Sequence, residues 1–149
     1  FHPETLYRAV VECPTPDEFV DGQATIFTTL ADGYTSDMNE VSALRPEYDS
    51  GAAAAYILPN VPWARRVSGV FSNSLVEQYP NRAHAILTDL GDDHFLVSIR
   101  APLNRREGAD TLARQFATGG GRSAAAGINR LPADELSKFL DAFAGAYSL

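Results

Sequence analysis

The sequence predicts an α/β fold: a mixed β-sheet flanked by helices and preceded by a helical linker segment. Stretches with strand and helix patterns alternate over the last two thirds of the chain. Two predicted strands, 83–90 and 94–101, are joined by the turn Gly91-Asp92-Asp93, so this pair is an antiparallel hairpin in a mixed sheet. The first part of the chain carries helix signals alone. We therefore expect a helical lead-in over 1–50 and an α/β domain over 51–149.

The lead-in is predicted to contain three helices. The first covers 2–12, and the second begins at Thr15-Pro16-Asp17-Glu18, a capping box with proline at the first helical position. Gly33 is predicted to end or kink that helix. Ser36 or Asp37 then caps a third helix, which stops before a proline.

The α/β domain is predicted to begin with a buried strand at 52–58, a short apolar run. Helices follow at 65–78, at 107–117 and from near Pro132 onward, each with an apolar stripe at helical spacing. The positions expected to be buried on these helices are Val67, Val70, Phe71, Leu75, Ala109, Leu112, Ala113, Phe116, Leu136, Phe139, Leu140 and Phe143.

The strand at 94–101 has one apolar face and one face with polar residues. Ser98 and Arg100 share the second face, because side chains alternate along a strand. If this strand is internal to the sheet, Arg100 points into a pocket or covers the sheet face, and in either case it needs an anionic partner. The partner of Arg100 is either a ligand or one of the acidic residues of the chain, and the sequence leaves both open.

Charge is distributed unevenly along a chain whose net charge is −7. Residues 1–62 hold two arginines against ten acids, whereas residues 100–130 hold six arginines against two acids. This argues against a protein that coats long nucleic acid and permits binding of a small phosphorylated ligand or a short strand end. The alternative is that the arginines only solvate one face of the domain.

The most informative stretch is 118–127, in which three consecutive glycines precede Arg122 and Ser123. Glycine is unfavourable in helix and strand interiors, so we predict a loop whose backbone N–H groups converge on an oxyanion. Arg122 adds a planar charged group suited to phosphate, and Ser123 adds a hydroxyl. The alternative is a flexible surface turn.

Several other kinds of site are excluded. The P-loop lysine is absent, and the glycines follow a predicted helix rather than a strand, unlike a dinucleotide-binding fingerprint. The three histidines show no metal-ligand spacing, and no Gly-x-Ser-x-Gly elbow is present. Cys13 is the single cysteine, which excludes an internal disulfide and fits a cytoplasmic protein. No apolar run is long enough for a membrane helix.

Ser98-Ile99-Arg100, a helix, and then Gly119-Gly120-Gly121-Arg122-Ser123-Ala124-Ala125-Ala126-Gly127 resemble a known pattern. They look like the DHH-associated carboxy-terminal domain of DHH-type phosphoesterases, the superfamily of RecJ-like exonucleases, oligoribonucleases and cyclic-dinucleotide phosphodiesterases. The hallmark of that domain is Ser-x-Arg, a helix, and Gly-Gly-Gly-His-x-x-Ala-Ala-Gly. The resemblance covers roughly 52–145. Arg122 stands where the motif has histidine, which indicates a divergent branch.

The resemblance implies a substrate-binding domain with no catalytic residues of its own. The residues it implicates in binding substrate or phosphate are Ser98, Arg100, Gly119, Gly120, Gly121, Arg122, Ser123, Ala126 and Gly127. Hydrolysis would need divalent metal, typically manganese, held by an upstream DHH domain that this chain lacks. The expected partners are a short oligonucleotide or small phosphoester, that upstream domain and a possible second copy, but no membrane. A non-catalytic nucleotide-binding module and a dimerisation module remain alternatives.

Overall fold

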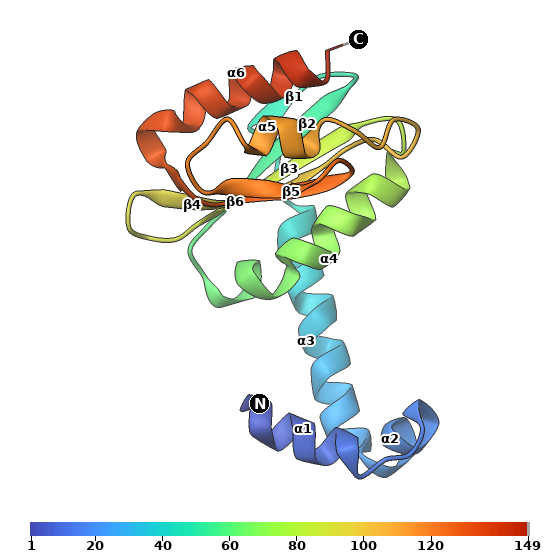
Figure 1. Cartoon of the computed structure of the whole chain (residues 1–149). Coiled ribbons are helices and arrows are strands. Elements are labelled where there is room, and N and C mark those ends of the chain that lie inside the picture. Colours follow the sequence, from blue (N-terminus) through green and yellow to red (C-terminus); the bar gives the residue numbers. More distant parts are fainter. Residues whose placement is uncertain (149) are drawn as a thin grey trace. The chain divides into compact units, whose positions relative to one another are not determined.

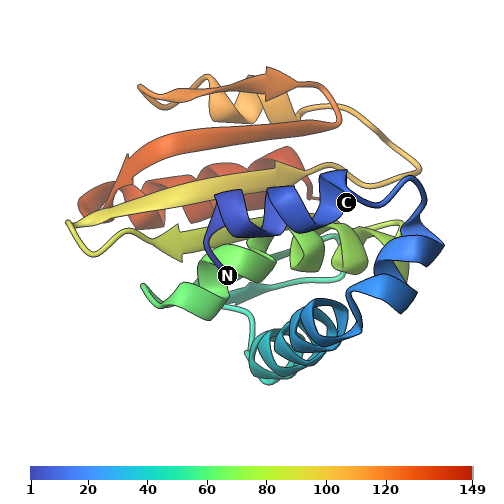
Figure 2. The same cartoon turned by 90° about the horizontal axis from the view of Figure 1, so that it is seen from below.

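A computed structural model describes residues 1–148 of the chain. By its internal contacts the chain divides into two units, one of residues Phe1–Asn39 and one that begins at Glu40. Figure 1 shows the elements of both units, and Figure 2 shows them from below. Each unit is described separately.

The first unit is helical, as predicted. It contains α1 (Pro3–Val11), α2 (Pro16–Gly22) and most of α3 (Ala24–Ser42), which continues into the second unit. The predicted capping box is present: Thr15 Oγ1 accepts a hydrogen bond from the Glu18 backbone N–H at 3.3 Å. This bond satisfies one of the backbone donors that a helix start leaves unpaired.

The prediction of a helix break at Gly33 is wrong, and so is the prediction of a new helix start at Ser36 or Asp37. The helix α3 runs without interruption through all three residues. One glycine costs an exposed helix only about 1 kcal/mol relative to alanine. The intact hydrogen bonds of a 19-residue helix outweigh that cost.

The second unit is built on a mixed six-stranded sheet with the order β1-β2-β3-β4-β6-β5. The strands are β1 (Tyr48–Asp49), β2 (Ala53–Leu58), β3 (Ala83–Asp89), β4 (His94–Arg100), β5 (Gly119–Arg122) and β6 (Ala125–Pro132). The β2–β3 pair is parallel and every other pair of neighbours is antiparallel. This confirms the predicted mixed sheet and the predicted hairpin of β3 and β4.

Helices cover both faces of this sheet (Figure 1). One face carries α4 (Pro62–Gln78), and the other carries α5 (Ala109–Ala113) and α6 (Leu136–Ala146), with the short 3-10 turn η1 (Ala133–Glu135) before α6. The main core lies between the sheet and the α5–α6 layer. Its fully buried large members include Leu87, Ile99, Leu112, Ile128, Leu131, Phe139 and Phe143.

Three helix predictions need correction. The helix predicted over 107–117 is only the five residues of α5, because Gly108 takes a left-handed conformation (φ 93°) that cannot lie inside a helix. The last helix begins at Leu136 rather than near Pro132, because Pro132 still pairs with His94 at the end of β6. Val70 was expected to be buried, but 41% of it is exposed because it lies on the outer side of α4.

Candidate phosphate-binding site

The strand β4 separates the core from the candidate site. Val97 and Ile99 are fully buried beneath the α5–α6 layer, whereas Ser98 and Arg100 lie on the other face of the sheet, as the alternation predicts. Cross-strand partners share a face. The face with Ser98 and Arg100 therefore continues onto their partners in β6, Gly127 and Ala125.

The three consecutive glycines form the edge strand β5, so the predicted loop is wrong. Tertiary packing overrides the weak strand propensity of glycine at this position. In a strand, successive N–H groups point in opposite directions, and they cannot converge on one oxyanion. Moreover, the Gly119 N–H already donates to the Phe116 carbonyl oxygen at 2.9 Å.

Gly119 and Gly121 lie on the core face, where there is no room for a side chain. A Cβ on Gly119 would lie 1.7 Å from the Ala113 carbonyl oxygen. A Cβ on Gly121, whose φ is 144°, would lie 2.5 Å from the Cα of the buried Ala126. Gly127 is equally constrained, since its Cβ would lie 2.7 Å from the Val97 carbonyl oxygen. These residues therefore serve close packing inside the domain.

Gly120 differs from its two neighbours. Nothing lies within 4 Å of the position that its Cβ would take. It pairs with Gly127 and thus faces the same side of the sheet as Ser98 and Arg122. Since nothing within the domain requires a glycine here, the space above Gly120 is open to a ligand.

Arg100 and Arg122 lie in one row across three strands, with Ala125 between them. Strands are roughly 4.8 Å apart, so the two arginine backbones are about 10 Å apart. The small side chain of Ala125 leaves space between the two guanidinium groups. Burial lowers the pKa of Arg100 from its usual value, and the positive charge of Arg122 lowers it further. A bound anion would offset both effects.

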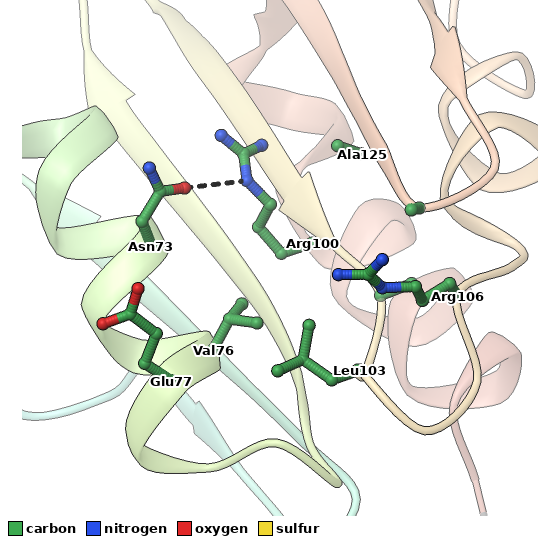
Figure 3. A pocket seen from close by; sticks show the side chains of 9 residues that line it. Asn73, Val76, Glu77, Arg100, Leu103, Arg106 and Ala125 are labelled. Carbon is green, nitrogen blue, oxygen red and sulfur yellow. Dashed lines mark hydrogen bonds between the residues drawn. The ribbon is translucent and has the colours of Figure 1, made fainter.

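A cavity of about 380 Å³ adjoins this row (Figure 3). It lies between the carboxyl-terminal half of α4 and the segment that follows β4. The lining residues are Asn73, Val76, Glu77, Arg100, Ala101, Leu103, Arg106, Ala124 and Ala125. Arg100 extends toward α4, where its Nε donates to Asn73 Oδ1 at 3.5 Å, and its Nη1 donates to the Ile99 carbonyl oxygen at 3.2 Å.

Three arginines at this site have no acidic partner among the described residues. Other arginines form ion pairs, as Arg114 does with Asp110 at 3.0 Å. By contrast, no carboxylate lies within ion-pair distance of Arg100, Arg106 or Arg122 anywhere in the part of the chain that the structure describes. The sequence left open whether an internal salt bridge neutralises Arg100, and the structure shows none within residues 1–148.

The structure brings some of the predicted site residues together on one face of the sheet and places others elsewhere. Ser98, Arg100, Gly120 and Arg122 share one face, whereas Ser123 is exposed in the β5–β6 turn, where its carbonyl oxygen accepts from the Ala109 N–H. The lining residues that sequence reasoning missed are Asn73, Glu77 and Arg106. Asn73 and Glu77 are one helical turn apart on the polar side of α4, a pattern that is typical of the solvent-exposed face of any surface helix.

Residues 1–148 hold no group of three or more His, Cys, Asp or Glu side chains that could bind a metal ion. No helix within the same range is both long and apolar enough to cross a membrane.

Similarity to known proteins is found in structure but not in sequence. No family model matches the chain, and no curated protein matches it in sequence. Among solved structures, the chain is similar to an exopolyphosphatase-related protein from Bacteroides fragilis, with 17% identity and a TM-score of 0.47. The match covers 89% of this chain but only 38% of that protein. A likeness of this size does not identify a function.

Proposed function

We propose that the second unit binds a phosphate group of a nucleotide or short oligonucleotide, as the substrate-binding part of a DHH-type phosphoesterase. Hydrolysis and its manganese ions would belong to a different domain of that enzyme. The observation that carries the proposal is the row of Arg100 and Arg122. Both lack an acidic partner among residues 1–148, although the chain carries a net charge of −7.

The geometry of the row suits a phosphate. Each guanidinium group can donate two parallel hydrogen bonds, and a phosphate offers acceptors on several sides. A phosphate above Ala125 would lie between Arg100 and Arg122, and the absence of a side chain at Gly120 would let it approach the sheet closely. Arg100 is also half-buried, which strengthens an interaction with an anion relative to the same contact in open water.

The resemblance supports the same interpretation. Its two separate motifs, the Ser-x-Arg of β4 and the glycine-rich stretch, lie on β4, β5 and β6, and Ser98, Arg100, Gly120 and Arg122 share one face of the sheet. In this proposal the roles within the motif differ from those that the resemblance implies. The arginine side chains would bind the phosphate, whereas Gly119, Gly121 and Gly127 maintain the packing that positions them.

The test is a titration of the chain with a 5′-phosphorylated dinucleotide, followed by isothermal calorimetry and by backbone amide shifts in NMR spectra. We expect shifts concentrated on Gly120, Arg122 and Arg100. Arg100→Ala and Arg122→Ala should each weaken binding at least about tenfold, since each removes charge-assisted hydrogen bonds. The affinity of the unmodified chain should also fall as salt concentration rises.

The matched control is Arg114→Ala, which removes an arginine that is already paired with Asp110. It should leave the dissociation constant unchanged. If Arg100→Ala and Arg122→Ala fold normally and bind as tightly as the unmodified chain, the proposal is wrong.

A second candidate function, dimerisation, is favoured by the position of β5 at the edge of the sheet. An edge strand exposes unpaired backbone groups that can pair with a second copy. Analytical ultracentrifugation would test it. Loss of a dimer on replacing Gly120 with a bulky residue would support this function, and a monomer at all concentrations would refute it.

A further inference from the structure

Glu77 places a carboxylate in a cavity whose other charged lining residues are arginines. It lines the same cavity as Arg100 and Arg106, and no arginine lies within ion-pair distance of it among the described residues. Figure 3 shows Glu77 and Asn73 on the α4 side of the cavity and Arg106 on the opposite side, in the segment after β4. The cavity therefore has a cationic side and a side with hydrogen-bond acceptors.

This arrangement restricts the chemistry of the ligand. An ionised carboxylate accepts hydrogen bonds and donates none, so Glu77 repels phosphate and attracts hydroxyl groups. The Asn73 amide can both accept and donate. A ligand that satisfies both sides carries phosphate at one end and free hydroxyl groups at the other. The ribose of a ribonucleotide provides such hydroxyls, and acidic side chains bind ribose 2′-hydroxyls in other nucleotide sites.

We propose that Glu77 is a specificity-determining residue that accepts a hydrogen bond from a ribose hydroxyl while the arginines hold the phosphate. This inference rests on the proposed function and adds to it the class of ligand. The site selects a ribonucleotide end over a deoxyribonucleotide, and it selects against inorganic polyphosphate, which is anionic throughout. The 2′-hydroxyl is the group by which a protein distinguishes RNA from DNA at one site.

The size and lining of the cavity agree with this ligand. Its volume of about 380 Å³ lies in the range of small-molecule sites, about 300–1,000 Å³. Between the two polar sides, Val76 and Leu103 provide apolar surface against which the sugar or base can pack. A nucleotide would then contact all three kinds of surface, whereas a bare phosphate would leave Glu77 unpaired.

The test compares two 5′-phosphorylated dinucleotides that differ only in the sugar, ribose or deoxyribose, with inorganic tripolyphosphate as a third ligand. Dissociation constants are measured by calorimetry for the unmodified chain and for Glu77→Met, which keeps the length of the side chain but removes its acceptors. The readout is the ratio of the two dinucleotide affinities. The loss of one negative charge affects both dinucleotides alike and cancels in that ratio.

For the unmodified chain we expect a ribose preference of about tenfold, the usual effect of one hydrogen bond to a charged group. In Glu77→Met this ratio should fall to about one, and tripolyphosphate should bind more tightly because a repulsive charge is gone. The matched control is Asp141→Asn, which removes an exposed acid from α6 on the other face of the sheet. It should change neither the ratio nor tripolyphosphate binding.

The outcomes separate this inference from the function on which it rests. Equal affinity for the two dinucleotides in the unmodified chain would overturn the role of Glu77 but leave phosphate binding intact. The role of Glu77 would also be overturned if Glu77→Met kept the ratio of dinucleotide affinities of the unmodified chain. The same holds if tripolyphosphate bound the unmodified chain more tightly than the ribonucleotide does. If neither dinucleotide binds, the proposed function itself fails.

Discussion

Arg122 stands where the DHH-associated motif has histidine, and this difference changes how pH acts on the site. A histidine gains its charge only below about pH 6.5, whereas a guanidinium group stays charged over the whole physiological range. The proposed site therefore keeps two fixed positive charges, Arg100 and Arg122, at every pH at which the protein is folded.

Replacing Arg122 with histidine should introduce a pH dependence. The Arg122→His variant should bind a 5′-phosphorylated dinucleotide nearly as tightly as the unmodified chain at pH 5.5. At pH 8 it should bind about tenfold more weakly, because the imidazole is then neutral. Calorimetry on both proteins at each pH isolates the effect of residue 122 from titration of the ligand. A constant ratio of affinities would show that residue 122 does not contact the phosphate.

His84 is a second residue with a predictable response to pH. It is fully buried on β3 opposite Arg100, and neither ring nitrogen has a hydrogen-bond partner among residues 1–148. Burial lowers the pKa of His84 to about 4, and the nearby charge of Arg82 contributes. The unfolded chain takes up this proton near pH 6.5, before the folded protein does. The free energy of unfolding should therefore fall between pH 6.5 and pH 4 and stay constant above that range.

The measurement is urea unfolding at pH 7 and at pH 4.5, compared with His84→Gln, which does not titrate. The unmodified chain should lose more stability than the variant by at most about 3 kcal/mol, the equivalent of a pKa difference of about 2.5 units. Carboxylates titrate equally in both proteins and cancel in the comparison. Equal losses of stability in the two proteins would mean that the ring nitrogens of His84 already form hydrogen bonds in the folded protein, for example to buried water.

At the scale of elements, the four residues of β5 are of two kinds. Gly119 and Gly121 pack against the core, whereas Gly120 and Arg122 face the proposed site. Gly119→Ala should destabilise the domain by about 1–3 kcal/mol, because its Cβ would overlap the Ala113 carbonyl oxygen. Gly120→Ala should leave stability nearly unchanged, because its Cβ meets no atom within 4 Å. Gly120→Ala should instead weaken dinucleotide binding. Thermal unfolding and calorimetry on the two variants check both statements, and equal stability of the two would contradict this account of β5.

The elements show which structural features local sequence can predict. The turn at 91–93 identified the hairpin of β3 and β4. Alternation of apolar residues identified the two faces of β4, because burial of one face produces that pattern directly. The glycine-rich strand could not be predicted, since the close packing that requires glycine comes from tertiary contacts with α5 and β6, which residue pattern alone does not reveal. For the same reason the site was predicted at Arg100 and Arg122, but Glu77 was not. Its role depends on where α4 lies against the sheet.

At the scale of the whole molecule, charge is divided between the two units. Residues 1–39 carry one arginine against seven acids, so most of the net charge of −7 lies in the first unit. The proposed phosphate site lies wholly within the second unit. The acidic first unit thus repels a nucleic-acid ligand, whereas the second unit carries the arginines of the proposed site.

A chain of residues 40–149 should fold alone and keep the site. It retains the whole sheet and the core beneath it. Its dinucleotide affinity at physiological salt should be within about threefold of that of the full chain, and it should exceed the full chain at low salt, where long-range repulsion by the acidic unit is least screened. Circular dichroism and calorimetry test this. A folded but non-binding fragment would show that the first unit contributes to the site.

The alternation of β4 has a consequence for how this protein can evolve. Val97 and Ile99 belong to the core, while Ser98 and Arg100 lie on the opposite face of the sheet, which carries the proposed site. Selection on folding and selection on binding therefore act on interleaved positions of one strand. In a saturation mutagenesis library, substitutions at Val97 and Ile99 should lower protein abundance. Substitutions at Ser98 and Arg100 should instead lower ligand binding and leave abundance nearly unchanged. Ligand preference could then diverge within a lineage while the scaffold is inherited intact.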